Sequence, residues 1–150
     1  CRKPKGGEPK YVYSTGLKTS KLLFGEYNIE KGELLCITEG PLDTIWLVQH
    51  GFYSVALFGL AMSKEQEIRL RNLKPQEYII CLDNDEAGQK AIYGYKDDAG
   101  RARTGIAERL SKYSAVSYIK IPNGFKDVQE IRDSLILNKV INNRTVIGGI

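Results

Sequence analysis

Five carboxylates in this chain each follow an apolar, strand-like run, and their types and spacing fit a divalent-metal site. They are Glu39, Asp43, Asp83, Asp85 and Asp127. The carboxyl ends of neighbouring parallel strands face one crevice of an open α/β sheet, which is the usual place for a ligand. Carboxylates crowded there repel one another and need cations, and an all-oxygen ligand set favours Mg²⁺ or Mn²⁺ over zinc or copper.

The local spacing brings these side chains together in pairs. Asp83 and Asp85 are two residues apart in a segment that leaves a strand, so both side chains point to the same side. Asp43 follows Glu39 by four residues, which is one helical turn. The intervening Gly40 allows a sharp backbone turn. We therefore expect all five carboxylates at one edge of the sheet.

Other interpretations of the Asp-x-Asp pair need different neighbours. A calcium-binding EF-hand loop that began at Asp83 needs an oxygen ligand at its fifth position and Glu at its twelfth, where this chain has Ala87 and Gly94. The alternative is that these carboxylates are ordinary solvated residues of a turn. This alternative is weakened because another acidic pair follows a second predicted strand. A zinc site is not expected, since His50 is the only histidine and the sequence has no Cys-x-x-Cys pair.

The elements that position these carboxylates alternate along the chain. Apolar runs predict strands, and helical spacing or capping patterns predict helices between them. The expected strands are residues 33–38, 53–58, 77–82 and 116–121. The expected helices are residues 42–49, 63–73 and a region 86–113 that is broken by glycines between 94 and 105. This alternation predicts an α/β fold with a roughly four-stranded, mainly parallel sheet flanked by helices.

The composition of the chain is that of an ordinary globular protein. Its 150 residues are 42% hydrophobic and 27% charged, enough for one domain with a substantial core. No apolar run approaches the ~20 residues that span a bilayer, and no secretory signal is seen, so we expect no membrane association. Cysteines 36 and 81 lie within apolar runs, which indicates reduced core thiols and a cytoplasmic location. Met62 is the only methionine, so we expect a piece of a longer protein.

The net charge of +4 is unevenly distributed. Residues 1–25 contain six basic residues and one acidic residue, whereas acidic residues gather after the predicted strands. A basic arm beside an acidic pocket suits a polyanion whose phosphates approach bound metal. The alternative is a solvated terminus, and charge alone does not separate the two.

Together these residues resemble the TOPRIM domain, a metal-binding module of bacterial-type primases, topoisomerases and some nucleases. Its hallmarks are a Glu-Gly pair after the first strand and an Asp-x-Asp pair after the third, here Glu39-Gly40 and Asp83-Asn84-Asp85. Within that family the chain is most similar to bacterial and phage primases. The segments that carry this similarity are residues 9–14, 23–25, 38–43, 56–59, 83–91 and 122–127, so that the resemblance covers residues 9–131.

The resemblance implies a nucleotidyltransferase that makes short RNA primers on a single-stranded DNA template from ribonucleoside triphosphates. The catalytic residues are then Glu39, Asp83 and Asp85, and the ligands of Mg²⁺ or Mn²⁺ are Glu39, Asp43, Asp83, Asp85 and Asp127. The arm resembles the lysine-tyrosine motif that precedes the module in these primases. This implies that nucleic acid or triphosphate binds to Lys10, Tyr11, Lys18 and Lys21, with Lys18 and Lys21 as alternatives for the second functional lysine.

By the same resemblance, residues 1–32 form a basic arm and lead-in, residues 33–131 the TOPRIM domain and residues 132–150 a C-terminal tail. A replicative helicase is the expected partner, through regions outside this chain. Two other functions stay open: a TOPRIM nuclease with water as nucleophile, and a non-catalytic nucleic-acid-binding module. Residues 94–105 look like an insertion, which is either a solvated loop or a loop that faces nucleic acid.

Overall fold

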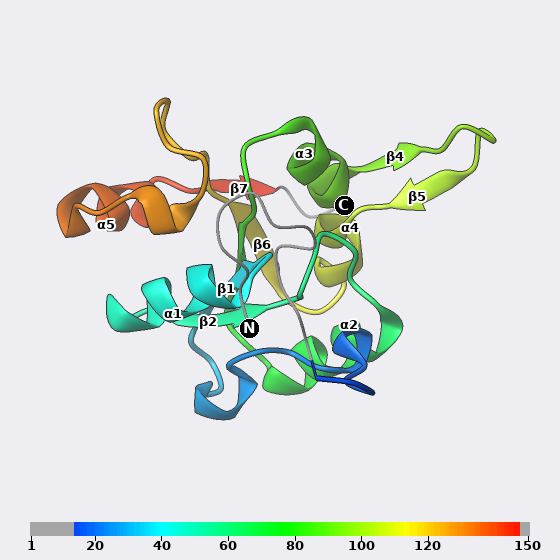
Figure 1. The fold of residues 1–150 in the computed structure, drawn as a ribbon, viewed down its shortest axis with the longest axis horizontal. Helices are drawn as coiled ribbons and strands as arrows, with labels where there is room; N and C mark the ends of the chain where they lie inside the picture. The colour runs from blue at the N-terminus through cyan, green and yellow to red at the C-terminus, as the bar shows by residue number, and fades with distance from the viewer. Residues whose placement is uncertain (1–13, 148–150) are drawn as a thin grey trace.

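A computed structural model describes residues 14–147 of the chain (Figure 1). The strands are β1 (Leu34–Thr38), β2 (Tyr53–Ala56), β3 (Glu77–Cys81), β4 (Gly94–Lys96), β5 (Ala102–Thr104), β6 (Ala115–Tyr118) and β7 (Thr145–Ile147). The α-helices are α1 (Pro41–Gln49), α2 (Lys64–Leu73), α3 (Glu86–Tyr93), α4 (Ile106–Leu110) and α5 (Ser134–Asn142). Short 3-10 helices are η1 (Thr19–Lys21), η2 (Glu26–Asn28) and η3 (Val128–Glu130).

Five of the strands form one sheet in the order β2-β1-β3-β6-β7. β1 pairs in parallel with β2 and with β3, and β3 pairs in parallel with β6. This confirms the mainly parallel α/β sheet predicted from the apolar runs. β7 adds a fifth strand, antiparallel to β6.

The segment 132–150 was expected as a tail, and its described part contains both α5 and β7. Leu137 and Ile141 of α5 are fully buried in the core. β7 has only three residues, of which Thr145 and Val146 are exposed, so the sequence contains no apolar run that would predict it. This strand depends on its pairing with β6 and not on a local pattern.

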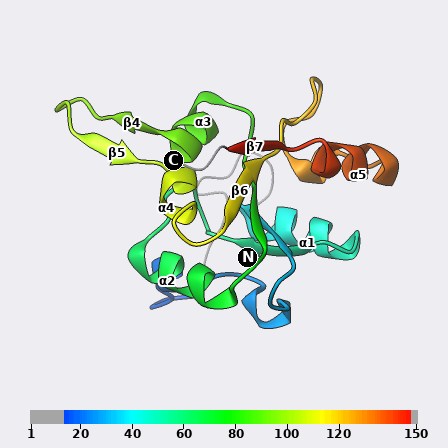
Figure 2. The same cartoon turned by 180° about the vertical axis from the view of Figure 1, so that it is seen from behind.

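Helices cover both faces of the sheet (Figures 1 and 2): α2, α3 and α4 lie on one side, and α1 and α5 on the other. Side chains of β1 and β3 alternate between the two sides. Leu35, Ile37, Tyr78 and Ile80 pack on the α2–α3–α4 side, and Cys36, Ile79 and Cys81 pack on the α1–α5 side. Strands buried on both faces need continuous apolar runs, which explains why the sequence signals β1 and β3 so clearly.

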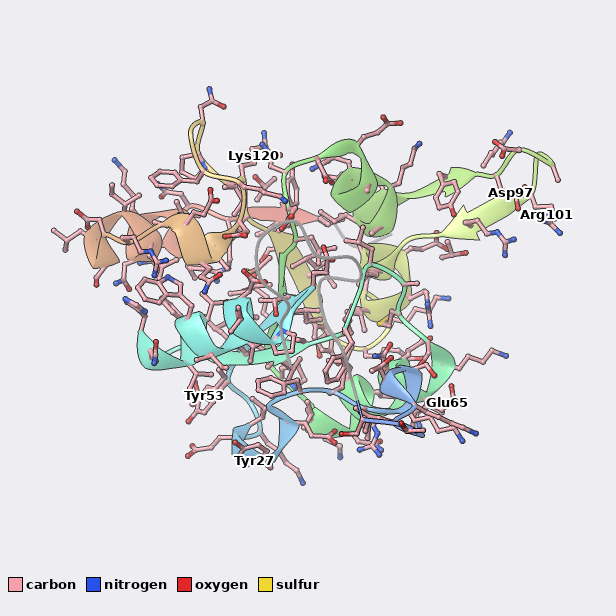
Figure 3. All side chains as sticks on the ribbon, in the orientation of Figure 1. Tyr27, Tyr53, Glu65, Asp97, Arg101 and Lys120 are labelled. Carbon is pink, nitrogen blue, oxygen red and sulfur yellow. The ribbon has the colours of Figure 1, made fainter. Side chains whose placement is uncertain are left out.

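The predicted helical region 86–113 is broken where its glycines lie. α3 ends at Tyr93, an antiparallel hairpin of β4 and β5 follows, and α4 resumes at Ile106. The hairpin extends away from the body of the molecule (Figure 1), and Figure 3 shows Asp97 and Arg101 together at its outer end. The break is confirmed, and the sequence had not specified that the inserted residues form a two-stranded hairpin.

Across residues 14–147, no helix combines the length and the apolar character that a membrane span requires.

Candidate active site

Glu39 and Asp83 leave neighbouring strands at nearly the same level. β1 ends at Thr38, whose register partner is Cys81 at the end of β3. Glu39 follows Thr38 directly, and Asp83 stands two residues beyond Cys81. Because the two strands are parallel and hydrogen-bonded, both acidic residues are delivered to one edge of the sheet, which we call the acidic edge.

Buried hydroxyl groups fix the turn that carries Glu39. Thr38 Oγ1 lies 2.7 Å from Thr44 Oγ1 and donates toward the carbonyl oxygen of Gly40 at 3.2 Å. Gly40 is the N-cap of α1, and Pro41 occupies its first turn, where the missing N–H is tolerated. The threonine pair therefore connects the end of β1 to the start of α1 across the Glu39 turn.

The loop after β2 also holds this turn in place. Leu57 N–H donates to the carbonyl oxygen of Thr38, and Gly59 N–H donates to that of Glu39, both at 3.1 Å. Between them Phe58 has φ of 62°, a conformation that a bulky side chain seldom adopts and that needs support from its surroundings. The predicted strand 53–58 ends at Ala56 because these last residues turn to contact the acidic edge.

The Asp83–Asp85 segment turns tightly into α3. Asp85 is the N-cap, and its Oδ1 accepts the N–H of Gly88 at 2.8 Å. A Cβ atom on Gly88 would lie 2.1 Å from the carbonyl oxygen of Asp83, so only glycine fits there. Asp85 thus has a structural role as well as a place in the acidic cluster.

The electrostatics of Asp83 set it apart from an ordinary surface carboxylate. Burial, followed by the nearby charges of Glu39, Asp127 and Asp85, raises the pKa of Asp83 from 3.8 to about 6, and Lys126 opposes this rise. The structure therefore brings four of the five predicted carboxylates within electrostatic reach of one another. A positive ion beside Asp83 would relieve the repulsion among them.

A pocket of about 230 Å³ opens at Asp83. It is lined by Asp83, Asn84 and Asp85 together with residues 122–126. Lys126 is exposed and supplies a cation beside the carboxylates. Sequence reasoning assigned it no role, and its position directly before Asp127 was the one available signal.

The remaining two carboxylates occupy helix starts around the same edge. Asp127 is the N-cap of η3, and its Oδ1 accepts the N–H of Glu130 at 3.0 Å. Asp43 stands in the first turn of α1, and its charge adds to burial and to Cys36 in raising the pKa of the Cys81 thiol. Asp43 therefore lies near the end of β3, one turn of helix from Glu39.

These acidic side chains are neighbours without forming a closed ligand set. Within residues 14–147, no three acidic, thiol or imidazole groups are grouped closely enough to hold a metal ion. The carboxylates lie near one another at the acidic edge, and the metal ligands assigned from the sequence stay predictions.

The basic residues predicted to bind phosphate lie elsewhere or outside the described range. Lys10 and Tyr11 precede the described residues. Lys18 and Lys21 are exposed in the segment around η1, which is attached to the start of α2. There the Gln66 amide donates to the carbonyl oxygens of Thr19 and Leu22. The contacts of this segment fix its backbone and leave both lysine side chains at the surface.

Residues 36–132 match the family model described as Toprim-like. A DNA primase from Pasteurella multocida is 31% identical over 125 residues, which are 78% of this chain and 20% of that protein. A DNA primase from Pseudomonas aeruginosa is 32% identical over 138 residues, which are 86% of this chain and 19% of that protein. The chain therefore spans about a fifth of the length of these relatives.

Solved structures share the fold. The crystal structure of a DNA primase domain from Pseudomonas aeruginosa aligns with a TM-score of 0.68 and 24% identity over 97% of this chain and 46% of that chain. The structure of the DnaG primase catalytic domain bound to ssDNA aligns with a TM-score of 0.67 and 20% identity, over 95% of this chain and 45% of that chain. The similarity thus extends beyond the family match to residues on both sides of it.

Proposed function

The chain belongs to the Toprim-like family, and from that premise we propose that it is part of the catalytic core of a DNA primase, a DNA-directed RNA polymerase that makes short RNA primers. The observation that carries the proposal is the acidic edge, where Asp83 is crowded by Glu39, Asp85 and Asp127. The identity with bacterial primases over most of the chain favours primer synthesis over the other activities of the family. We assign residues 33–131 to the TOPRIM domain, residues 1–32 to the lead-in and residues 132–150 to the segment that follows it.

The residues at the acidic edge fit a hard divalent cation, Mg²⁺ or Mn²⁺. The charged oxygen atoms gathered there are all carboxylate oxygens, which suit such an ion. The pKa of Asp83, raised first by burial and then by the neighbouring carboxylates, supports a cation beside it. Asp83, Asp85 and Asp127 would hold the ion, completed by Glu39 and supported by Asp43. When bound, such an ion stabilises the negative charge that develops during phosphoryl transfer.

The protein's own groups have distinct parts in this proposal. Glu39 accepts the proton of the attacking 3′-hydroxyl group, or else completes the metal site. Lys126, at the rim of the Asp83 pocket, lies where it can neutralise phosphate oxygens of the incoming ribonucleoside triphosphate. Lys10 and Tyr11, with Lys18 or Lys21, contact the triphosphate or the single-stranded DNA template.

Partners and location follow from the proposed activity. A template strand, ribonucleoside triphosphates and the RNA primer would occupy the catalytic core, and a replicative helicase would bind regions beyond this chain. Because primers are made on replicating DNA, we place the protein in the cytoplasm of a bacterium or of a phage-infected cell.

The test is primer synthesis on single-stranded DNA by the full-length protein, with Asp83→Ala compared with wild type. The loss of a group that holds the metal removes several kcal/mol of transition-state stabilisation, so we expect synthesis to fall by a factor on the order of a hundred or more. Lys10→Ala should cause a smaller loss, largest at low salt and shrinking as the salt concentration rises, because salt weakens the phosphate contact that wild type makes.

The matched control is Glu108→Gln, which removes an exposed carboxylate on α4. It should leave primer synthesis unchanged. Undiminished synthesis by Asp83→Ala would refute the proposed active site. If the wild-type protein instead cleaved DNA in Mg²⁺ and made no primers, the nuclease alternative would replace the polymerase.

A further inference from the structure

A groove of about 570 Å³ lies beside α3, on the side of the β4–β5 hairpin. Its floor is apolar and comes from residues 60–62 of the β2–α2 loop and from Ala87 and Ala91 of α3. Lys90, Tyr95 and Arg103 contribute to its rim. Three cationic side chains line the groove, and each has a carboxylate partner: Lys90 pairs with Glu86 at 2.6 Å, Arg103 with Asp97 at 3.0 Å and Arg109 with Glu67 at 2.6 Å. Lys90 and Arg103 are half exposed and keep further N–H donors that an anionic occupant can accept.

The hairpin that forms one wall is built firmly onto the end of α3. A Cβ atom on Gly94 would lie 2.3 Å from the carbonyl oxygen of Arg103, and one on Gly105 would lie 2.2 Å from that of Ile92. The close approach at Gly94 joins the two strands of the hairpin, and the close approach at Gly105 packs the end of the hairpin against the last turn of α3.

The hairpin presents an aromatic ring and a guanidinium group on one face. Tyr95 and Arg103 are register partners in the antiparallel pair, so their side chains lie next to each other on the same side. Tyr95 is 47% exposed. Asp97 accepts a hydrogen bond from Arg103 Nε at 3.1 Å and one from Arg101 Nε at 2.9 Å. This carboxylate orders both arginines and leaves part of each guanidinium fork available to another acceptor.

The opposite wall is also fixed. Arg109 of α4 donates to the carbonyl oxygens of Met62 and Ser63 and pairs with Glu67 at 2.6 Å. These bonds fasten the β2–α2 loop to α4. Contacts within the chain therefore hold both walls, and such preorganisation lowers the entropy cost of binding.

One end of the groove meets the acidic edge. Leu60, which lines the groove, follows Gly59, whose N–H binds the carbonyl oxygen of Glu39. Ala87, on the other side, stands two residues after Asp85, the N-cap of α3. A chain that lay in the groove would reach the carboxylates within a few residues of its length.

We propose that this groove, between α3 and the Tyr95–Arg103 face of the hairpin, is a binding site for single-stranded nucleic acid that continues from the acidic edge. Cationic side chains would contact phosphates and Tyr95 would stack on a base, as in sequence-tolerant single-strand binding. That this strand is the DNA template rests on the proposed function. A protein partner on the hairpin is the competing occupant, and the position beside the carboxylates favours the template.

The experiment measures binding of a fluorescent single-stranded DNA oligonucleotide to the full-length protein in EDTA without nucleotides, so that the acidic edge contributes no metal. Tyr95→Ala should weaken binding about tenfold through the lost stacking. Arg103→Gln should weaken it less and should lower the slope of log K against log salt by about 0.7. Lys139→Ala, on α5 at the opposite side of the molecule in Figure 1, is the control and should change neither quantity.

Photocrosslinking keeps the test independent of any folding defect. An oligonucleotide that contains 4-thiothymidine should crosslink to peptides with residues 94–104 in the wild-type protein. Normal affinity of Tyr95→Ala and Arg103→Gln, or crosslinks confined to other regions, would overturn the inference. The inference would also be overturned if the two hairpin variants bound DNA normally but no longer bound a protein partner. Primer synthesis tests the proposed function separately. If Asp83→Ala lost primer synthesis while the hairpin variants still bound DNA normally, only the proposed role of the groove would be refuted.

Discussion

Asp83 at the acidic edge and Asp97 on the hairpin are the same chemical group in opposite surroundings. Burial and the charges of neighbouring carboxylates raise the pKa of Asp83 to about 6. A backbone hydrogen bond from Arg101, with side-chain bonds from Arg101 and Arg103, lowers the pKa of Asp97. Two arginines balance the charge of Asp97, which holds the hairpin turn together, whereas Asp83 lies among like charges, which is the setting that its proposed role in binding a cation requires.

The largest difference between the two regions is expected when the glycine near each aspartate is replaced by alanine and the loss of stability is measured. In Gly88→Ala, the added methyl group meets the backbone of Asp83, which cannot move without breaking the turn. We expect the free energy of unfolding to fall by about 2–3 kcal/mol or more. In Gly100→Ala near Asp97, nothing lies within 4 Å of the new atom, and only the positive φ of 75° is unfavourable. Denaturant unfolding should show a loss of about 1 kcal/mol for Gly100→Ala; equal losses would contradict the tight turn at Asp83.

Removal of the charge of Asp83 should stabilise the metal-free protein. Because its pKa is higher in the folded chain than the ordinary 3.8, the folded state binds more protons than the unfolded state between pH ~4 and ~6. The free energy of unfolding contributed by this group is therefore lost as pH rises through that window. In EDTA at pH 7.5, Asp83→Asn should be more stable than wild type by about 1 kcal/mol, after allowance for solvent screening.

The gain from Asp83→Asn should vanish below pH 4, where both states of the wild-type protein are protonated. Added Mg²⁺ should stabilise the wild-type protein and have little effect on the variant. Thermal unfolding against pH, with and without Mg²⁺, checks both points. An Asp83→Asn protein that is less stable than wild type in EDTA at pH 7.5 would show that its neighbours do not repel it.

The smallest effect is expected at Asp97, whose partners are at the surface. Asp97 Oδ1 accepts the N–H groups of Ala99 and Arg101, at 3.1 and 3.0 Å. Asp97→Ala should accelerate hydrogen exchange at these two amides and leave the global unfolding transition in place, because exposed ion pairs add little stability. Its stabilising contacts weaken in wild type as pH falls below the ordinary pKa of an aspartate. Unchanged exchange at both amides would mean that Asp97 does not order the hairpin.

Local patterns predicted most of the fold. The parallel strands are near-continuous apolar runs, and the Ser63–Gln66 capping box that starts α2 is present with both of its hydrogen bonds. β7 could not be predicted, because three residues with two exposed carry no periodic pattern and depend on β6. The hairpin was indicated only by glycines, since its alternation is too short to distinguish strands from a loop.

The motifs predicted which carboxylates meet, because each follows a strand whose end is fixed by the sheet. Spacing could not show that Asp85 and Asp127 also cap helices, nor that Lys126 and Asp83 line one pocket. It also could not show the strained Phe58, whose conformation depends on hydrogen bonds between segments that are distant in sequence. Long-range contacts therefore account for what the sequence left open at the site.

Calorimetric titration of Mn²⁺ into the full-length protein tests whether the crowded carboxylates bind a metal ion. Asp83→Asn should weaken Mn²⁺ binding at least ~10-fold, whereas Asp97→Asn and Glu108→Gln should bind Mn²⁺ as wild type does. Equal Mn²⁺ affinity in wild type and Asp83→Asn would contradict the proposal, because the crowded carboxylates would then not be the metal site.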